Sequence, residues 1–432
     1  MLVAQDRILL DRLDQARVQT DKLFEIVRPE CLYDRPIAER HRIVFYIGHL
    51  EAFDWNLLRS HSNLRSFDEN LDRLFAFGID PVDGGLPSDQ PSDWPAIEHV
   101  RQYGARVRQE LDSLLRDAPE ILLNTAIEHR LMHAETLAYM LHQLPLEKKI
   151  RLRQVDVPER GQPRPESIEI PEGPVTLGLS RHSTHFGWDN EYDAHTVNVP
   201  AYAIDRYKIT NGQYLEFMRA GGYQDQSLWT PSDWEWRSAD DISYPAFWKR
   251  TGDQWHLRTH LQTMFDEIPL PLSWPVYVSQ AEASAYACWS GKRLPTEAEW
   301  QRSAYGSPDR AERSFPWGAE TPGPEHGYFD FERWDPVPVD AFPRGRSAFG
   351  LDGLLANGWE WTASPFEPFE GFKASPFYEG YSANFFDGKH FVMKGGSPRT
   401  DRSMLRRSFR NWFQPHYPYV YAGFRCANSG SQ

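Results

Sequence analysis

Tryptophan is unevenly distributed along this chain, and the distribution limits the folds that are open to it. Of the 16 tryptophans in the 432 residues, 14 lie beyond residue 180. The part before that point carries apolar residues at helical spacing, whereas the later part breaks short apolar alternations with glycine, proline and tryptophan. One uniform architecture does not produce both patterns, so we expect domains of different fold class.

Residues 1–145 show the pattern of an antiparallel four-helix bundle. Apolar residues recur at helical spacing over roughly 5–28, 39–60, 95–117 and 119–143. The stretch FAFGIDPVDGGLPSDQPSDWP at 75–95 is rich in glycine, proline and aspartate, so it predicts a long crossing loop rather than a helix. Long loops inside a domain are often functional.

Beyond Leu144 the helical pattern ends. Proline and charged residues are frequent in 146–170, which predicts an extended linker. Residues 171–432 then combine short apolar alternations such as HTVNVPAYAIDRYKIT with one clear helix at SQAEASAYACWSG. We therefore predict an α+β protein, in which a helical bundle precedes a mixed α/β domain with much irregular chain held by tryptophans.

Charge and cysteine content argue against several classes of function. Asp and Glu number 61 against 47 Lys and Arg, and the net charge of −14 disfavours nucleic acid and acidic membrane surfaces as partners. The N-terminus is broken by charges and no long apolar run follows it, so we expect a cytoplasmic protein. The three cysteines are too scattered for a disulfide framework or a sulfur-ligated zinc site, so any metal needs histidine or carboxylate ligands.

Three histidines in the predicted bundle could hold such a metal. His129 and His133 are four residues apart in HRLMHAE, so on a helix their imidazoles project from one face about one turn apart. His49 lies among apolar residues of the second predicted helix, which must be largely buried. Three imidazoles leave coordination positions open, which suits a metal that binds substrate as well as protein. The alternative is that the same histidines are structural.

These histidines and a series of downstream motifs resemble the ergothioneine-synthase group of non-heme iron enzymes. The motifs are GKRLPTEAEW at 291–300, NGWEWT at 357–362, KGGS at 394–397, SFRNW at 408–412 and GFRC at 423–426. Members of this group join a DinB-like four-helix bundle to a C-type-lectin-like domain that resembles the formylglycine-generating enzyme. The resemblance spans nearly the whole chain and implies the same two-domain fold.

The resemblance also implies an O2-dependent reaction at one Fe(II) ion held by His49, His129 and His133. Enzymes of this group attach sulfur or selenium to the imidazole carbon of hercynine, the Nα-trimethylated form of histidine. By the same resemblance, Tyr378 delivers a proton or hydrogen atom during the reaction, and Tyr381 lines the pocket beside it.

Asn411 and Trp412 match residues of the group that hold the backbone end of the substrate. An indole face suits a permanent trimethylammonium charge, which cannot donate hydrogen bonds and is attracted by the ring. An amide beside that ring can orient the substrate carboxylate.

The segment between His129 and His133 departs from the pattern of the group. The usual Glu-Gln-Gln is replaced by Arg130, Leu131 and Met132. A polar contact expected just before His133 is therefore missing, and part of substrate recognition must differ.

The expected contacts to a peptide donor are also replaced. Members that use γ-glutamylcysteine grip its carboxylates with arginines in the bundle loop, whereas this loop carries acids, among them Asp80 and Asp83, and no arginine. Those members also follow the Asn-Trp pair with Asp and, four residues later, Arg. This chain has Phe413 and Tyr417 at these places. A dianionic donor would leave its charges unpaired here.

Carboxylates and aromatic rings suit a neutral sugar, because acids accept hydrogen bonds from hydroxyls and rings stack on C–H faces. The substitutions therefore predict a selenosugar donor and a reaction of the selenoneine-synthase type, in which a carbon–selenium bond forms with hercynine. The enzymatic alternative is an ergothioneine-type sulfoxide synthase that uses cysteine or γ-glutamylcysteine. Formylglycine generation needs two close reactive cysteines, and the C-terminal motifs contain only Cys426. The non-enzymatic alternative is a binding scaffold.

Overall fold

The computed structural model of this chain describes residues 2–59, 61–62, 64–76, 86–150, 160–259 and 267–429. The chain forms two compact units, Met1–Leu152 and Arg153–Gln432. Within the described residues, no helix combines the length and the apolar character that crossing a membrane requires.

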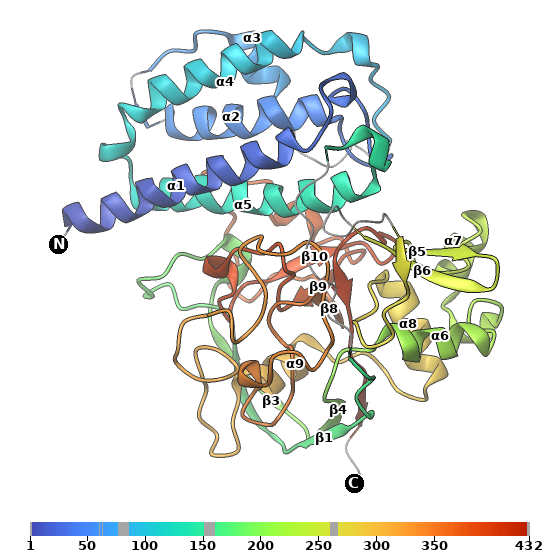
Figure 1. Cartoon of the computed structure of the whole chain (residues 1–432). Coiled ribbons are helices and arrows are strands. Elements are labelled where there is room, and N and C mark those ends of the chain that lie inside the picture. Colours follow the sequence, from blue (N-terminus) through green and yellow to red (C-terminus); the bar gives the residue numbers. More distant parts are fainter. Residues whose placement is uncertain are drawn as a thin grey trace. The chain divides into compact units, whose positions relative to one another are not determined.

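The first unit is a bundle of α-helices (Figure 1). Its helices are α1 (Leu2–Glu25), α2 (Ile43–Arg59), α3 (Glu69–Leu74), α4 (Ile97–Asp112) and α5 (Glu120–Gln143). α1 packs along α5, and α2 packs against both α4 and α5. The four predicted helices are confirmed with shifted ends, whereas the short α3 is an addition that its weak periodicity did not reveal.

α5 is buried over most of its circumference, because α1 and α2 both pack against it. A helix that is buried on several faces is expected to be apolar all round. α5 instead carries buried polar residues in its middle, among them Glu128, His129, Arg130 and His133. Buried polar side chains require partners, so this part of α5 is where a specific site is expected.

The second unit is a mixed α/β domain. Its helices are α6 (Asn211–Arg219), α7 (Pro231–Ala239), α8 (Gln280–Trp289) and α9 (Glu297–Tyr305). Its strands are β1 (Ser167–Ile170), β2 (Gly173–Leu177), β3 (His195–Val199), β4 (Tyr202–Asp205), β5 (Trp248–Thr251), β6 (Gln254–Arg258), β7 (Glu267–Pro269), β8 (Trp359–Pro365), β9 (Phe391–Lys394), β10 (Asn411–Phe413), β11 (Ala422–Gly423) and β12 (Ala427–Ser429). β1 occupies the end of the range that the sequence predicts as linker.

Four small sheets organise the described part of this unit, in the orders β1-β4-β12, β10-β9-β8-β11, β2-β3 and β5-β6-β7. β10 pairs with β9 in antiparallel register, with Trp412 opposite Val392. β11 pairs with β8 in parallel, with Ala422 opposite Trp359. The sheet β10-β9-β8-β11 therefore brings together several of the motifs that are far apart in the sequence.

Two motifs also form helix-capping and buried-charge contacts. Thr296 caps α9 by accepting a hydrogen bond from the backbone N–H of Glu299, whose carboxylate in turn accepts from the N–H of Thr296. This capping box explains the Thr-x-x-Glu spacing of GKRLPTEAEW. The fully buried Glu360 accepts from Trp300 Nε1 (2.9 Å) and from Arg425 Nε (2.6 Å). The motifs therefore build the core of this unit.

Candidate metal centre and substrate-binding residues

α2 and α5 bring the three predicted histidines together. The candidate ligand atoms of His49, His129 and His133 all lie within 4.8 Å of one another. His133 Nε2 is 3.3 Å from His49 Nε2 and 3.1 Å from His129 Nε2. The Nε2 atoms of all three rings therefore converge on one point inside the bundle.

The tautomer of His49 shows what this convergence requires. Its Nδ1 lies 2.7 Å from the backbone oxygen of Phe75, and a carbonyl can only accept, so Nδ1 carries the hydrogen. The Nε2 atom then presents a lone pair toward the other rings. A cation is the natural partner of converging lone pairs, and two metal–nitrogen bonds of about 2.1 Å at right angles place their nitrogens about 3.0 Å apart. The donor set fits a divalent transition metal.

Burial keeps these imidazoles neutral. It lowers the pKa of His49 to about 4 and the pKa of His129 and of His133 well below the ordinary value. Mutual repulsion between the rings, if they were charged, acts in the same direction for His129. Neutral imidazole is the form that binds a metal, so no proton has to be removed at neutral pH.

Aromatic rings pack against the histidines and support their orientation. Phe53 stacks on the imidazole of His129, with ring centroids 3.4 Å apart and an interplanar angle of 10°. Phe45 stacks on His49 at 4.9 Å. Trp94, from the loop after α3, lies edge-on to Phe45 at 5.9 Å. Such supporting contacts orient metal ligands and exclude water from the site.

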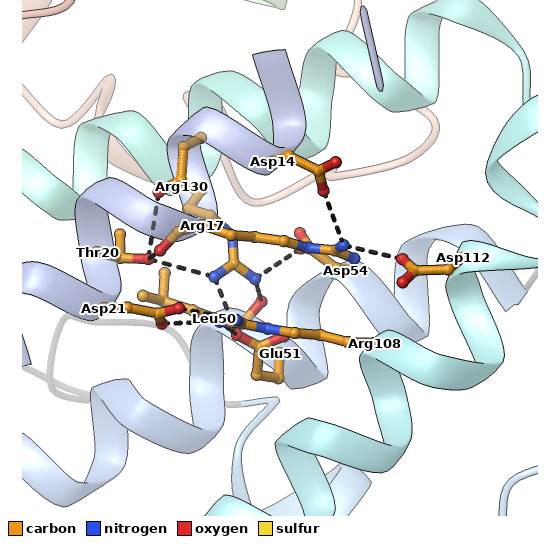
Figure 2. Close-up of polar contacts among 11 residues, drawn as sticks. Asp14, Arg17, Thr20, Asp21, Leu50, Glu51, Asp54, Arg108, Asp112 and Arg130 are labelled. Carbon is orange, nitrogen blue, oxygen red and sulfur yellow. Dashed lines mark hydrogen bonds and ion pairs between the residues drawn. The ribbon is translucent and has the colours of Figure 1, made fainter. Parts of the chain in front are cut away.

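A buried charge network lies next to this centre (Figure 2). The side chain of Arg130 is buried within the bundle, where its Nη1 donates to Glu51 Oε1 (3.0 Å) and its Nη2 to Asp54 Oδ2 (2.6 Å). Burial raises the pKa of Asp54. Burial acts in the same sense on Glu51, but Arg130 and Arg108 outweigh it and bring the pKa of Glu51 to about 2.

The sequence marks Arg130 only as a departure from the group, and these partners are not predicted from it. A signal is present, because Glu51 and Asp54 stand three residues apart among the mainly apolar residues of α2. On a helix this spacing puts both carboxylates on one face.

One carboxylate of the acidic loop, that of Asp89, is already paired with arginines. Asp80 and Asp83, predicted to bind substrate, lie outside the described residues. Asp89 forms ion pairs with Arg35 and with Arg42 and also accepts from Trp94 Nε1. The loop contains no arginine of its own, but two arginines from the segment between α1 and α2 reach it. Asp89 is therefore not free to bind sugar hydroxyls, because these guanidinium groups hold its carboxylate.

The predicted tyrosine and tryptophan residues gather in the second unit. The rings of Tyr378 and Tyr381 lie 5.7 Å apart, and Trp412 meets Tyr381 edge-on at 5.3 Å. Trp188, which the sequence analysis did not single out, stacks on Tyr381 at 4.0 Å. Phe366 stacks on Trp412 at 4.1 Å with an angle of 6°. Trp188, Tyr381 and Phe366 are buried, so Tyr378 and Trp412, which are half-buried, are the rings of this cluster that are partly accessible.

Polar contacts fix the loop that carries the two tyrosines. Asp189, next to Trp188, accepts hydrogen bonds from the hydroxyl of Ser382 and from the backbone N–H of Ser375. These bonds hold the loop on both sides of Tyr378 and Tyr381. The signal for them was the polar run Asp-Asn-Glu after Trp188, which has no helical or strand periodicity to explain it.

The remaining predicted residues lie on and just after β10. Asn411 Oδ1 accepts from the N–H of Trp412 (2.9 Å), which leaves its amide NH2 group as a donor. Phe413 and Tyr417 stack on each other, with ring centroids 5.3 Å apart and an angle of 10°. No acid or arginine occupies these two positions, as the sequence analysis noted.

Cys426 does not have the properties of a reactive thiol. It is completely buried, and burial together with Asp205 raises its pKa far above the ordinary value. A thiol that stays protonated is a poor nucleophile and a poor metal ligand. Its environment gives no support to formylglycine-type chemistry.

Comparisons with protein-family models divide the chain at the same place as the structure does. Residues 12–154 match the DinB superfamily, and residues 153–430 match the sulfatase-modifying factor enzyme 1-like domain. The predicted fold class is therefore confirmed.

Comparison with curated proteins finds relatives over most of the chain. Hercynine oxygenase from Mycolicibacterium smegmatis is 36% identical, over 79% of this chain and 79% of that protein. Ergothioneine biosynthesis protein 1 from Neurospora crassa is 29% identical, over 93% of this chain and 55% of that protein. Formylglycine-generating enzyme from Bos taurus is 28% identical, over 62% of this chain and 76% of that protein.

Hercynine oxygenase and ergothioneine biosynthesis protein 1 thus match a larger share of this chain than the formylglycine-generating enzyme does. This chain belongs to the hercynine oxygenase family, with a DinB-superfamily domain followed by a sulfatase-modifying factor enzyme 1-like domain.

Proposed function

We propose that this chain is an O2-dependent, mononuclear non-heme Fe(II) enzyme that joins a sulfur donor to the imidazole carbon of hercynine, as an ergothioneine-type sulfoxide synthase does. The convergence of three buried, neutral imidazoles carries this proposal. The names of the relatives support hercynine as substrate and favour sulfur over the selenosugar that the sequence predicts.

His49, His129 and His133 would hold the ion through their Nε2 atoms. Bound Fe(II) would supply the redox chemistry that joins O2, the donor and the substrate imidazole, for which zinc is unsuited. The surrounding residues Phe45 and Phe53 would keep the imidazoles oriented and the site dry.

The aromatic cluster of the second unit would recognise the trimethylammonium group of hercynine. An aromatic ring attracts a cation that cannot donate hydrogen bonds, and the half-buried Trp412, which packs against Tyr381, would meet this group. The amide NH2 of Asn411 would donate to the substrate carboxylate. The phenolic Oη of Tyr378 would deliver a proton or hydrogen atom to the oxygen that the reaction reduces.

A metal measurement tests the centre. Protein loaded with Fe(II) under anaerobic conditions should hold roughly one iron per chain, and His133→Ala should lose it. His99→Ala is the matched control, since His99 is an exposed histidine on α4 of the same unit. Equal iron content in wild type and His133→Ala would leave the histidines structural and would favour a binding scaffold.

A competition assay identifies the donor. The Fe(II)-loaded protein is given hercynine, O2 and equal amounts of cysteine, γ-glutamylcysteine and a selenosugar, and the products are identified by mass spectrometry. A sulfoxide of a hercynine–thiol adduct supports the proposal. Absence of any hercynine adduct would contradict it.

A selenosugar remains the second candidate donor. The stacked rings of Phe413 and Tyr417 favour it, because they replace the acid and the arginine that contact a peptide donor in the resembling enzymes. In the same competition assay, a selenium isotope pattern in the product would establish this second candidate over the first.

A further inference from the structure

The buried residue Arg130 lies within one helical turn of His129 and His133 on α5. Arg130 directly follows His129 on α5, and its partners Glu51 and Asp54 come two and five residues after His49 on α2. Neighbouring residues of a helix point about 100° apart, so Arg130 leaves α5 about 100° round from His129 and about 60° from His133, beside the face that carries the imidazoles. The imidazoles of His129 and His133 and the guanidinium of Arg130 are thus attached to one short stretch of the α5 backbone, so they move together.

Arg130 ties three helices together (Figure 2). Besides the two carboxylates of α2, its Nη2 donates to the backbone oxygen of Leu50 (2.9 Å) and its Nη1 lies 3.4 Å from Thr20 Oγ1 on α1. Both carboxylates are buried, Asp54 completely so. A charge-assisted fork of this kind has a fixed planar geometry, so it defines rotation as well as distance.

Small motions of α5 against α2 would separate the imidazoles. A slide by one residue moves a helix by about 1.5 Å along its axis, which is large beside the spacing of the Nε2 atoms. The same slide would pull the guanidinium nitrogens away from Glu51 and Asp54, and those buried carboxylates would lose their partner. The arrangement of α5 against α2 in which Arg130 bonds to both Glu51 and Asp54 is therefore also the arrangement in which the three imidazoles converge.

We propose that Arg130 is a positioning residue: through Glu51 and Asp54 it sets the rotation and register of α5 against α2, and thereby the affinity and geometry of the metal site. The proposal rests on the proposed function, because it assumes that the three histidines bind a metal. It assigns Arg130 no contact with substrate.

The test uses the full chain and Co(II), whose visible absorption reports the geometry of its ligands. Arg130→Lys keeps the charge but cannot form the two-armed fork. Arg17→Lys is the matched control, since Arg17 is also a buried arginine of this unit but bonds to Asp112 of α4 and Asp14 of α1. Co(II) affinity and spectrum are measured beside thermal unfolding of the metal-free protein.

We expect Arg130→Lys to weaken Co(II) binding by at least about tenfold and to change the Co(II) spectrum, as loss of a supporting contact does at other metal sites. Arg17→Lys should lower the unfolding temperature but leave affinity and spectrum as in wild type. Equal affinity and identical spectra in the two variants would overturn the proposal and leave Arg130 a contributor to stability only.

Asp54→Leu decides the matter if Arg130→Lys does not fold. Leucine has nearly the same shape but no acceptor for Arg130 Nη2, so one arm of the fork is lost. A weaker and altered Co(II) site is expected, and an unchanged site overturns the proposal. His49→Ala separates this outcome from failure of the proposed function. If wild type and His49→Ala bind Co(II) alike, the metal site itself is refuted, whatever Arg130 does.

Discussion

Replacing Glu360 with glutamine should destabilise the second unit by about 3–5 kcal/mol. Glu360 is fully buried, and its Oε1 accepts from Lys208 Nζ (3.0 Å) and from Arg425 Nη2 (2.8 Å). Its Oε2 accepts from Trp300 Nε1 and Arg425 Nε. Glutamine has the same size but no charge, so two buried cations lose their counter-charge, which is the costly way to break a buried ion pair.

For a domain of this size, each kcal/mol corresponds to about 2–4 °C, so a fall in unfolding temperature of roughly 6–20 °C is expected. Tryptophan fluorescence reports this unit selectively, because 14 of the 16 tryptophans lie beyond residue 180. Urea unfolding followed by fluorescence therefore gives the free-energy change of the affected unit.

The control is Glu332→Gln, in which an exposed carboxylate with no ion pair among the described residues is neutralised. Its effect should stay within about 0.5 kcal/mol. If Glu360→Gln also lowers the free energy of unfolding by less than about 1 kcal/mol, Glu360 does not balance the charges of Lys208 and Arg425, and the reasoning is refuted.

Three further perturbations test other contacts. Phe53→Leu should weaken Co(II) binding about tenfold by removing the ring that orients His129, and an unchanged titration would contradict this. Burial lowers the pKa of Lys394 to about 8, so between pH 8 and 10 the unfolded chain keeps a proton that the folded chain has lost. The free energy of unfolding of wild type, relative to Lys394→Met, should therefore rise with pH by up to about 1.4 kcal/mol per unit, and parallel pH profiles would refute it. Asp89→Asn removes the charge that pairs with Arg35 and Arg42. Turnover with donors that carry a carboxylate should then rise about threefold relative to turnover with a neutral thiol. Asp93→Asn, where the carboxylate only accepts from a backbone N–H, should leave that preference unchanged.

The parts of the fold that depend on local periodicity could be predicted from the sequence. The long helices of the bundle and α8 carry enough apolar residues at regular spacing to be recognised. α6, α7 and α9 are nine residues long and were not predicted as helices, because so short a segment shows little more than two turns. Capping residues such as Thr210 and Thr230 would have indicated two of them.

The residues of the candidate site likewise divide into those that a local sequence pattern predicts and those that it does not. The spacing of His129 and His133 is a local signal, and the burial of His49 follows from its apolar neighbours. The ion pairs of Arg130 and of Asp89 join residues 79 and 47 positions apart, so no local pattern reveals them. Arg130, which the sequence marks only as a departure from the group, carries a buried charge with two carboxylate partners, and the carboxylate of Asp89 is paired with two arginines.

These contacts also indicate which residues can report the identity of the donor. Trp300, Glu360 and Arg425 belong to three of the motifs on which the family resemblance rests, yet together they form a buried charge cluster. Substituting any of them would leave a buried polar or charged group without its partner, at a cost that does not depend on which donor the enzyme uses. Such motifs therefore identify the fold. Phe413 and Tyr417 are not part of that charge cluster: they stack on each other, and Tyr417 also meets Tyr419 edge-on. Exchange of these two side chains is therefore the change expected to alter donor preference without breaking the cluster. A Phe413→Asp, Tyr417→Arg double variant that folds normally and gains activity with γ-glutamylcysteine would show that donor choice is made at this pair.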